Sequence, residues 1–150
     1  MKNATITALM TASILIAGCG KKGNSSSSPE TRPTVQADVK GVWICQSATS
    51  KGKALDEATA KLLTLTLTQD RYVSKRGTDI VWNAGYAVDA SQQPPHIDIM
   101  DAEGVLKGIY FLTDEMLKIC YVEPGKARPT VFDSTPGSGA HLFVWKRQKP

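Results

Sequence analysis

Hydrophobic and polar residues alternate with a period of two over most of this chain after about residue 38. The clearest run is residues 63–68, in which leucine and threonine alternate. Because successive side chains of a β-strand point to opposite faces of a sheet, this run predicts a strand with leucine on one face and threonine on the other. Comparable runs predict about eight strands. They cover residues 41–47, 63–68, 72–75, 79–89, 96–100, 105–113, 117–121 and 141–147.

Short polar segments separate the predicted strands, and most of them are short enough to connect antiparallel neighbours. Examples are residues 69–70, 77–78 and 114–115. Only residues 54–61 favour a short helix. Eight consecutive antiparallel strands leave two exposed edges unless the sheet closes, so we predict an all-β, up-and-down antiparallel barrel. A β-sandwich is the alternative.

The chain begins with a different kind of segment. Lys2 is followed by an apolar run, residues 4–17, that is too short to span a bilayer as a finished helix. The run ends in Ile16-Ala17-Gly18-Cys19. This arrangement resembles the signal peptide of bacterial lipoproteins, in which the leader is removed and the cysteine is acylated. An ordinary secretory leader and an uncleaved anchor are the alternatives.

The lipoprotein resemblance implies a mature protein held in a membrane of the cell envelope by acyl chains, such as palmitate, on Cys19, and facing the periplasm or the exterior. We therefore divide the chain into a signal peptide (residues 1–18), a lipidated tether (19–37) and a barrel domain (38–150). The tether is rich in serine, glycine, lysine and proline and has almost nothing to bury, so we expect it to be flexible.

The last third of the barrel domain carries a second resemblance. In order, it contains Gly108-Ile109-Tyr110, Leu117-Lys118-Ile119-Cys120, Pro124-Gly125-Lys126, Arg128-Pro129-Thr130, Phe132 and Pro136-Gly137-Ser138-Gly139. This pattern resembles a conserved hypothetical domain of planctomycete proteins that is described as lipocalin-like. The resemblance implies a barrel fold and, because the activity of that family is unassigned, no particular chemistry.

The first predicted strand is also similar to the opening signature of lipocalins. It contains Gly41 and Trp43 separated by one residue. In lipocalins the tryptophan plugs the closed end of the barrel, and a basic residue from the last strand lies over it. The resemblance implies this structural role for Trp43, with Arg147 as the basic residue and Lys146 as the second choice.

Cys45 and Cys120 remain as an even pair once Cys19 is lipidated, and an oxidising compartment favours a disulfide between them. The strand alternation opposes this bridge, because Cys45 shares the expected inward face with Trp43 whereas Cys120 shares the expected outward face with Lys118. A bridge also requires Cα atoms within about 7 Å, and the first and seventh strands of a meander are not neighbours. Two separate thiols are therefore favoured over the disulfide.

Charge and motif content exclude several classes of function. The net charge is +4, and the basic residues are scattered rather than gathered in a stripe with aromatic residues, so we expect no nucleic-acid binding. His96 and His141 have no partners at the spacing of a metal site or a nucleophilic active site, and no phosphate-binding glycine motif is present. We therefore predict a non-enzymatic protein without a metal or cofactor.

Two non-enzymatic functions are compatible with a barrel of this size. In the first, the interior is open and binds a small apolar ligand, with Trp82, Tyr86 and Tyr110 as its lining. In the second, the interior is filled and the protein is an interaction or inhibitor module for an envelope protein.

The surface of such a module would be the connection 123–140, which is too long for an ordinary hairpin and offers Lys126, Arg128 and Phe132. This connection is expected either as a flap over one barrel mouth or as a clasp whose Phe132 packs on the barrel.

Overall fold

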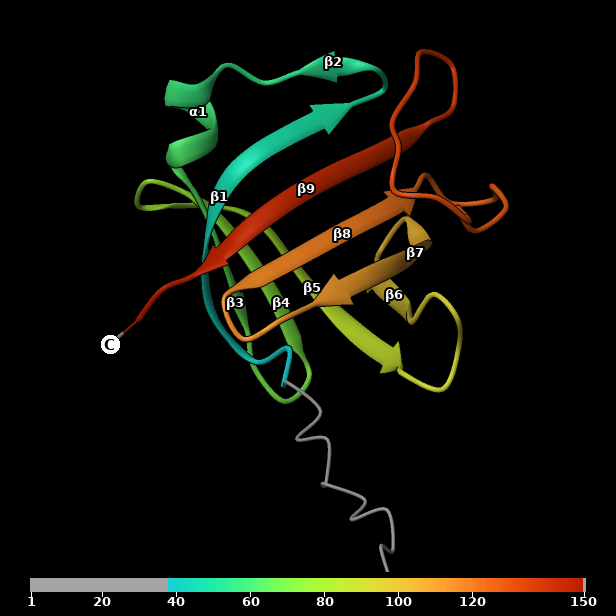
Figure 1. The fold of residues 1–150 in the computed structure, drawn as a ribbon, viewed down its shortest axis with the longest axis horizontal. Helices are drawn as coiled ribbons and strands as arrows, with labels where there is room; N and C mark the ends of the chain where they lie inside the picture. Colours follow the sequence, from blue (N-terminus) through green and yellow to red (C-terminus); the bar gives the residue numbers. More distant parts are fainter. Residues whose placement is uncertain (1–37, 150) are drawn as a thin grey trace, which may run out of the picture. The chain divides into compact units, whose positions relative to one another are not determined.

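The computed structural model describes residues 38–149. The predicted signal peptide (residues 1–18), the lipid-attachment residue Cys19 and the predicted tether (19–37) lie outside the described residues. The described chain forms nine strands and one short helix (Figure 1). They are β1 (Gly41–Ser50), β2 (Lys53–Ala54), α1 (Glu57–Lys61), β3 (Leu63–Leu67), β4 (Arg71–Arg76), β5 (Asp79–Asp89), β6 (His96–Asp101), β7 (Gly104–Leu112), β8 (Met116–Val122) and β9 (Ala140–Arg147).

The strands form one antiparallel sheet in which each strand from β3 to β8 pairs with the next along the chain. β1 pairs with β3 on one side and with β9 on the other, and this last pairing closes the sheet. The predicted eight-stranded, up-and-down antiparallel barrel is therefore confirmed, and the sheet is not split into the two layers of a sandwich. β2 pairs with the last two residues of β1 as a small hairpin arm beside the barrel.

The apolar face of each strand points into the barrel. Paired residues of neighbouring strands share a face, and Leu65 lies between Trp43 on β1 and Ser74 on β4. The same alternation around the barrel builds one apolar core. Its buried members include Trp43, Cys45, Leu63, Leu65, Leu67, Tyr72, Ala84, Ile97, Ile99, Leu106, Tyr110, Leu117, Ile119, Tyr121 and Trp145. These buried side chains form a packed core inside the barrel.

The helix is shorter than the predicted segment 54–61. Asp56 caps its first turn, because Oδ1 of Asp56 accepts a hydrogen bond from the Thr59 backbone N–H at 2.9 Å. Residues before the cap are held in the β2 arm instead. Ala60 is buried in the core, which attaches α1 to the barrel beside β1.

Antiparallel strands place their connections alternately at two ends of the barrel. One end carries residues 38–40, the turns 68–70 and 113–115, and residues 148–149. We call it the plugged end. The opposite end carries α1 and the turns 77–78 and 102–103, and we call it the cavity end.

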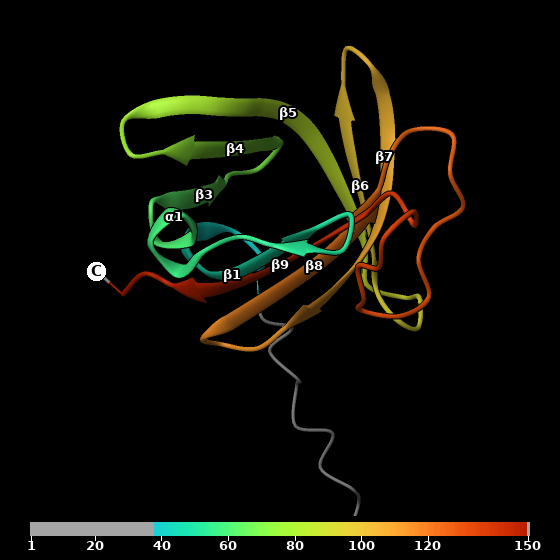
Figure 2. The ribbon, with the colours of Figure 1, turned by 90° about the horizontal axis from the view of Figure 1, so that it is seen from above.

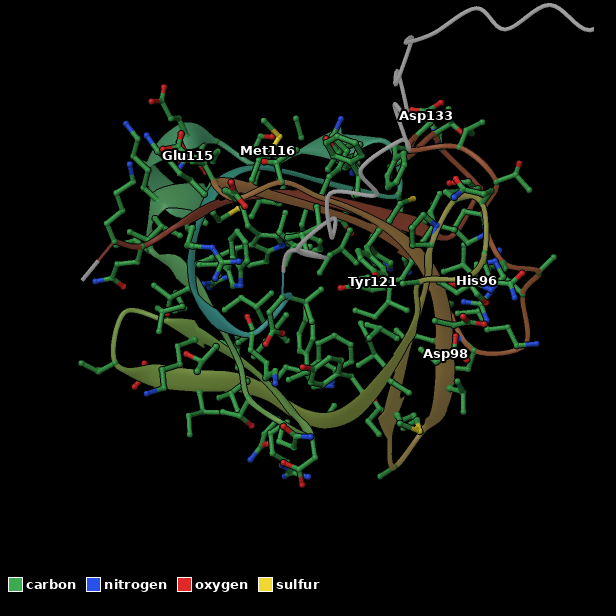
Figure 3. The ribbon with its side chains drawn as sticks, turned by 60° about the horizontal axis from the view of Figure 1, so that its bottom comes forward. His96, Asp98, Glu115, Met116, Tyr121 and Asp133 are labelled. Atoms are coloured by element: carbon green, nitrogen blue, oxygen red, sulfur yellow. The ribbon has the colours of Figure 1, made fainter. Side chains whose placement is uncertain are left out.

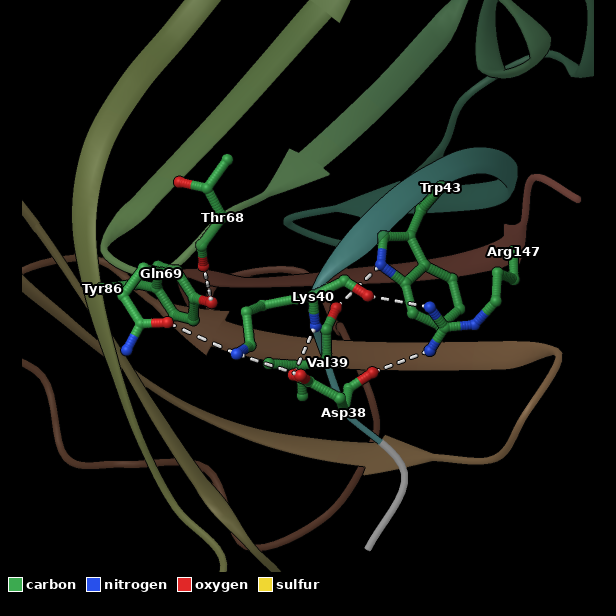
Figure 4. A network of polar contacts seen from close by, with 8 residues as sticks. All are labelled: Asp38, Val39, Lys40, Trp43, Thr68, Gln69, Tyr86 and Arg147. Atoms are coloured by element: carbon green, nitrogen blue, oxygen red, sulfur yellow. Dashed lines mark hydrogen bonds and ion pairs between the residues drawn. The ribbon is translucent and has the colours of Figure 1, made fainter. Parts of the chain in front are cut away.

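Trp43 and Arg147 form the plug (Figure 4). Trp43 is fully buried, and its indole N–H donates to the Val39 carbonyl at 2.9 Å. Cζ of Arg147 lies 4.1 Å from the centre of the Trp43 ring, which is the stacking that the lipocalin resemblance implies. The Arg147 guanidinium also donates to the carbonyls of Asp38, Lys40 and Asp114, at 2.7 to 2.8 Å.

Gly41 makes this stacking possible. Its φ is +135°, a conformation that favours glycine, and a Cβ atom at this position would lie 2.7 Å from Nη1 of Arg147. The glycine two residues before the tryptophan therefore leaves the space that the guanidinium occupies.

Candidate functional site

The barrel wall opens at β5. The first half of this strand, residues 79–85, pairs with β4, whereas residues 85–89 pair with β6. Residues 79–84 therefore have a strand neighbour on one side and diverge from the β6–β7 hairpin on the other, as Figure 2 shows. A bulge opposite Ser74 and Lys75 adds to the bend of the strand.

A cavity of about 520 Å³ occupies this opening at the cavity end, and it is widely accessible to solvent. Trp82 and Asn83 come from β5, Leu106 from β7, Tyr121 from β8 and His141 from β9. Asp101, Ala102 and Glu103 come from the end of β6 and the turn that follows it. These eight residues line the cavity.

Aromatic rings form the inner wall of the cavity. The ring of Trp82 meets Tyr72 edge to face at 5.1 Å between centroids, and it lies 5.8 Å from Tyr121 at an interplanar angle of 47°. Tyr121 in turn stacks on His141 at 5.2 Å and on Phe143 at 5.9 Å. Each ring is held by its neighbours, so the wall is preorganised.

The polar groups of the cavity are also fixed in place. Oδ2 of Asp101 accepts a hydrogen bond from Nε1 of Trp82 at 3.1 Å, which bridges the opening between β5 and β6. Oδ1 accepts the backbone N–H groups of Glu103 and Gly104 at 2.8 and 3.1 Å. The Asp101 carboxylate thus organises both the turn and the aromatic wall.

His141 contributes a neutral ring. Its Nδ1 lies 2.9 Å from Oγ of Ser50, across the β1–β9 pairing. Burial lowers the pKa of His141, and nearby Lys51 lowers it further, while Glu123 opposes both effects. Since the ordinary histidine pKa of about 6.5 already lies below neutrality, the ring is uncharged at pH 7.

The three predicted lining residues separate in the structure. Trp82 lines the cavity. Tyr86 lies near the plugged end, where its hydroxyl donates to the Thr68 carbonyl at 2.6 Å (Figure 4). Tyr110 is buried in the packed core, and burial raises its pKa. The structure therefore does not bring the three rings together around one space.

Asp101, Glu103, Tyr121 and His141 also line the cavity, and no sequence motif points to them as site residues. Asp101 and Glu103 lie between two predicted strands, and Tyr121 and His141 follow the ordinary alternation of their own strands. The sequence therefore gives little indication that the four residues meet. The bend of β5 opens the wall beside them.

The long connection after β8 runs over the outer face of the barrel instead of covering a mouth (Figure 2). Nη1 of Arg128 lies 2.7 Å from Oδ1 of Asp98 and donates to the carbonyls of Gly108 and Ile97, at 2.6 and 3.2 Å. Figure 3 shows Asp98 and His96 on this outer side, whereas Tyr121 is turned toward the interior.

Phe132 fastens the other half of this connection. It packs on an apolar cluster on the outer wall made of Ile109, Cys120, Val122, Ala140 and Leu142. The Lys118 ammonium lies 5.6 Å from the centre of its ring. Arg128 and Phe132 thus hold the connection to the wall, while Lys126 remains exposed.

The two cysteines lie on opposite sides of the wall, and both are free thiols. Cys45 is in the barrel core and donates weakly to the Ser47 carbonyl at 3.4 Å. Cys120 lies under Phe132 and donates to the Asp133 carbonyl at 3.4 Å. Burial raises the pKa of Cys45 to about 11, so this side chain is protonated at neutral pH.

Within residues 38–149, no group of three or more His, Cys, Asp and Glu side chains is placed to hold a metal ion. This same part of the chain contains no helix long and apolar enough to cross a membrane. Comparison of the chain with protein-family models, with curated proteins and with solved structures finds no match. The resemblance to planctomycete lipocalin-like domains stays a prediction, and the functional argument depends on the cavity.

Proposed function

We propose that this protein is a membrane-tethered lipoprotein of the cell envelope whose barrel binds a small ligand without transforming it. One observation carries the proposal: a cavity of about 520 Å³, with an aromatic wall and a few fixed polar groups, at one end of a barrel whose other end is plugged. Small-molecule sites in proteins have volumes of about 300–1,000 Å³ and this same mixture of apolar surface and convergent polar groups.

The packed interior defines where a ligand would lie. Leu65, Ile99 and Ile119 are fully buried in the core, so the apolar interior is occupied by the protein's own side chains. An open space lies beside Trp82 and Tyr121. We infer a ligand that rests on these rings at the cavity end and keeps part of its surface in water.

We favour a binding role over a hydrolase role for the Ser50–His141 pair. In a serine hydrolase the second ring nitrogen of the histidine is oriented by a carboxylate. Among residues 38–149, no carboxylate forms a hydrogen bond with His141, whose ring is held by Ser50 and by stacking on Tyr121. This arrangement supports a binding role.

The position of Asp38 determines the end of the barrel to which the proposed anchor would be joined. The described chain enters the barrel at the plugged end, where Arg147 binds the Asp38 carbonyl. An acyl anchor at Cys19 would thus be joined to the end opposite the cavity. Because the anchor would not be attached beside the cavity, this connectivity supports exchange of the ligand with the aqueous phase.

The anchor is tested by Cys19→Ser. Because acylation requires the thiol, we expect this variant to lose incorporation of labelled palmitate and to remain unprocessed. Metabolic labelling followed by mass spectrometry of the N-terminal peptide measures both effects. Equal labelling of the variant and the parent chain would show that Cys19 is not the acylated residue.

The binding site is tested by filling it. Ala102 lies in the exposed turn that borders the cavity, so Ala102→Trp adds a large ring there with little disturbance of the core. We expect native mass spectrometry of the full chain, released from uncharged detergent micelles, to show a bound small molecule on the parent and at least about tenfold less on Ala102→Trp, equivalent to about 1.4 kcal/mol.

Ala127→Trp is the matched control, because Ala127 is exposed in the 123–139 connection, outside the cavity lining. It should retain the ligand. Loss of the ligand from Ala127→Trp with retention in Ala102→Trp would move the site from the cavity to the connection and favour the interaction-module alternative.

A further inference from the structure

We propose that the ligand of this cavity is an organic cation, with its ammonium group against the rings of Trp82 and Tyr121 and its charge balanced by Asp101 and Glu103. This inference rests on the proposed binding function and adds the chemical class of the ligand. It replaces the purely apolar ligand expected from the sequence with one that carries a positive charge on an apolar body.

The charge of the cavity lining is the first argument. Of the eight lining residues, Asp101 and Glu103 carry negative charge, and among residues 38–149 no lysine or arginine lines the space. His141 adds no positive charge at pH 7, because burial and Lys51 lower its pKa. This local excess of negative charge lies on a chain whose net charge is +4.

The aromatic wall is the second argument. A cation is attracted to the face of an aromatic ring when it lies within about 6 Å of the ring centroid, and tryptophan gives the strongest effect. The rings of Trp82 and Tyr121 meet at 47° with centroids 5.8 Å apart, so they form a corner instead of a closed stack. A compact ammonium head group fits such a corner, since it can contact both rings.

The Trp82–Asp101 hydrogen bond joins these two features. The carboxylate is held 3.1 Å from the indole nitrogen, so its negative charge stays beside the ring that would receive the cation. Two backbone N–H groups fix the other carboxylate oxygen. The site is therefore arranged before a ligand binds, which reduces the ordering that binding requires.

Tyr121 provides an observation independent of the charges. Its side chain lines the cavity and is only 7% exposed, yet its hydroxyl makes no hydrogen bond with any residue of the described chain, 38–149. The hydroxyl oxygen is not one of the fully buried, unpartnered polar atoms of residues 38–149, so it reaches the open cavity, where a water or a ligand can bind it. The Tyr121 oxygen can accept a hydrogen bond from an ammonium N–H or face the partial positive charge of an N-methyl group.

The test compares three probes of nearly equal shape on the full chain in uncharged maltoside micelles. Choline is the cation, 3,3-dimethyl-1-butanol replaces its nitrogen by carbon and is neutral, and 3,3-dimethylbutanoate is an anion. The readout is the indole N–H resonance of Trp82 in protein labelled with ¹⁵N-tryptophan, assigned by its loss in Trp82→Phe. We expect choline to bind about tenfold more tightly than the neutral alcohol, and the anion to leave the resonance unmoved.

Glu103→Gln tests the charge without changing the shape of the site. Glu103 is exposed in a turn, so the variant should fold normally, and we expect choline affinity to fall about threefold or more while the affinity for the alcohol is unchanged. Glu115→Gln is the matched control, since Glu115 is an exposed turn residue at the plugged end. It should bind choline as the parent does.

Two results would overturn the inference. If choline and the alcohol shift the Trp82 resonance at the same concentrations, the cavity does bind small molecules but does not select a cation, and the proposed function stands. If choline leaves the resonance unmoved, the cation assignment is wrong, and the Ala102→Trp comparison still decides separately whether the cavity binds the protein's own ligand.

Discussion

Replacing Trp43 by alanine is expected to lower the free energy of unfolding by about 3–5 kcal/mol, the range for truncation of a large buried aromatic side chain. Trp43 is fully buried at the plugged end, and its loss would leave a cavity beneath the Arg147 guanidinium. The variant would also lose the hydrogen bond from the indole to the Val39 carbonyl. A domain of this size has a total stability of about 5–15 kcal/mol, so the effect is large.

The midpoint of urea denaturation, followed by circular dichroism, measures this loss. Trp82→Ala is the control, because Trp82 is only partly buried at the opening of the wall. We expect this variant to lower the free energy of unfolding clearly less than Trp43→Ala does. An equal midpoint shift for the two variants would mean that the plug is no more important to stability than the cavity wall. The proposed ligand site would be unaffected, since the lining of the cavity does not include Trp43.

Much of the fold could be predicted because the barrel follows directly from a local pattern. Alternation in residues 63–67 defines an inward leucine face, and the short turns make neighbouring strands antiparallel. The Gly41-X-Trp43 pattern could be interpreted for a similar reason, since its three positions are adjacent in sequence. The structure shows the physical constraint behind it, which is the space that Gly41 leaves for Arg147.

The candidate site could not be predicted, because alternation gives the face of a residue and not its height along the barrel. Trp82 and Tyr86 share the inward face of β5, yet one lines the cavity and the other binds Thr68 near the plugged end. The opening itself depends on where β5 changes partners from β4 to β6. That change is set by the bend and register of three strands, which no short segment of sequence encodes.

The connection 123–139 shows that contacts between residues far apart in the sequence could not be predicted either. The sequence predicts Arg128 and Phe132 as interaction residues, because a long connection with an arginine and an aromatic residue is a common binding surface. In the structure their partners are Asp98 and Cys120, on strands β6 and β8 of the protein's own wall. Only the packing of the connection reveals that these side chains are already occupied.

Gly108→Ala is expected to destabilise the barrel by about 1–3 kcal/mol, the usual cost of overpacking a filled core. A Cβ atom at residue 108 would lie 2.8 Å from the Cys120 carbonyl oxygen and 2.9 Å from Cβ of Tyr121. The first of these is backbone in the paired strand β8, so the strands would have to move apart. Gly108 also offers its carbonyl to Arg128, so the change would disturb both the outer connection and the cavity residue Tyr121.

Gly85→Ala is the matched control for this last prediction, because it makes the same substitution in strand β5. The nearest atoms to a Cβ at residue 85 are 3.8 Å away, which is ordinary contact, and the backbone there has no positive φ. Alanine restricts the unfolded chain more than glycine does, so we expect this variant to be unchanged or more stable by up to about 1 kcal/mol. Denaturation midpoints measure both effects. Equal midpoints for the two variants would contradict the close approach of β7 to β8 at Gly108, and with it the placement of Tyr121 against the cavity.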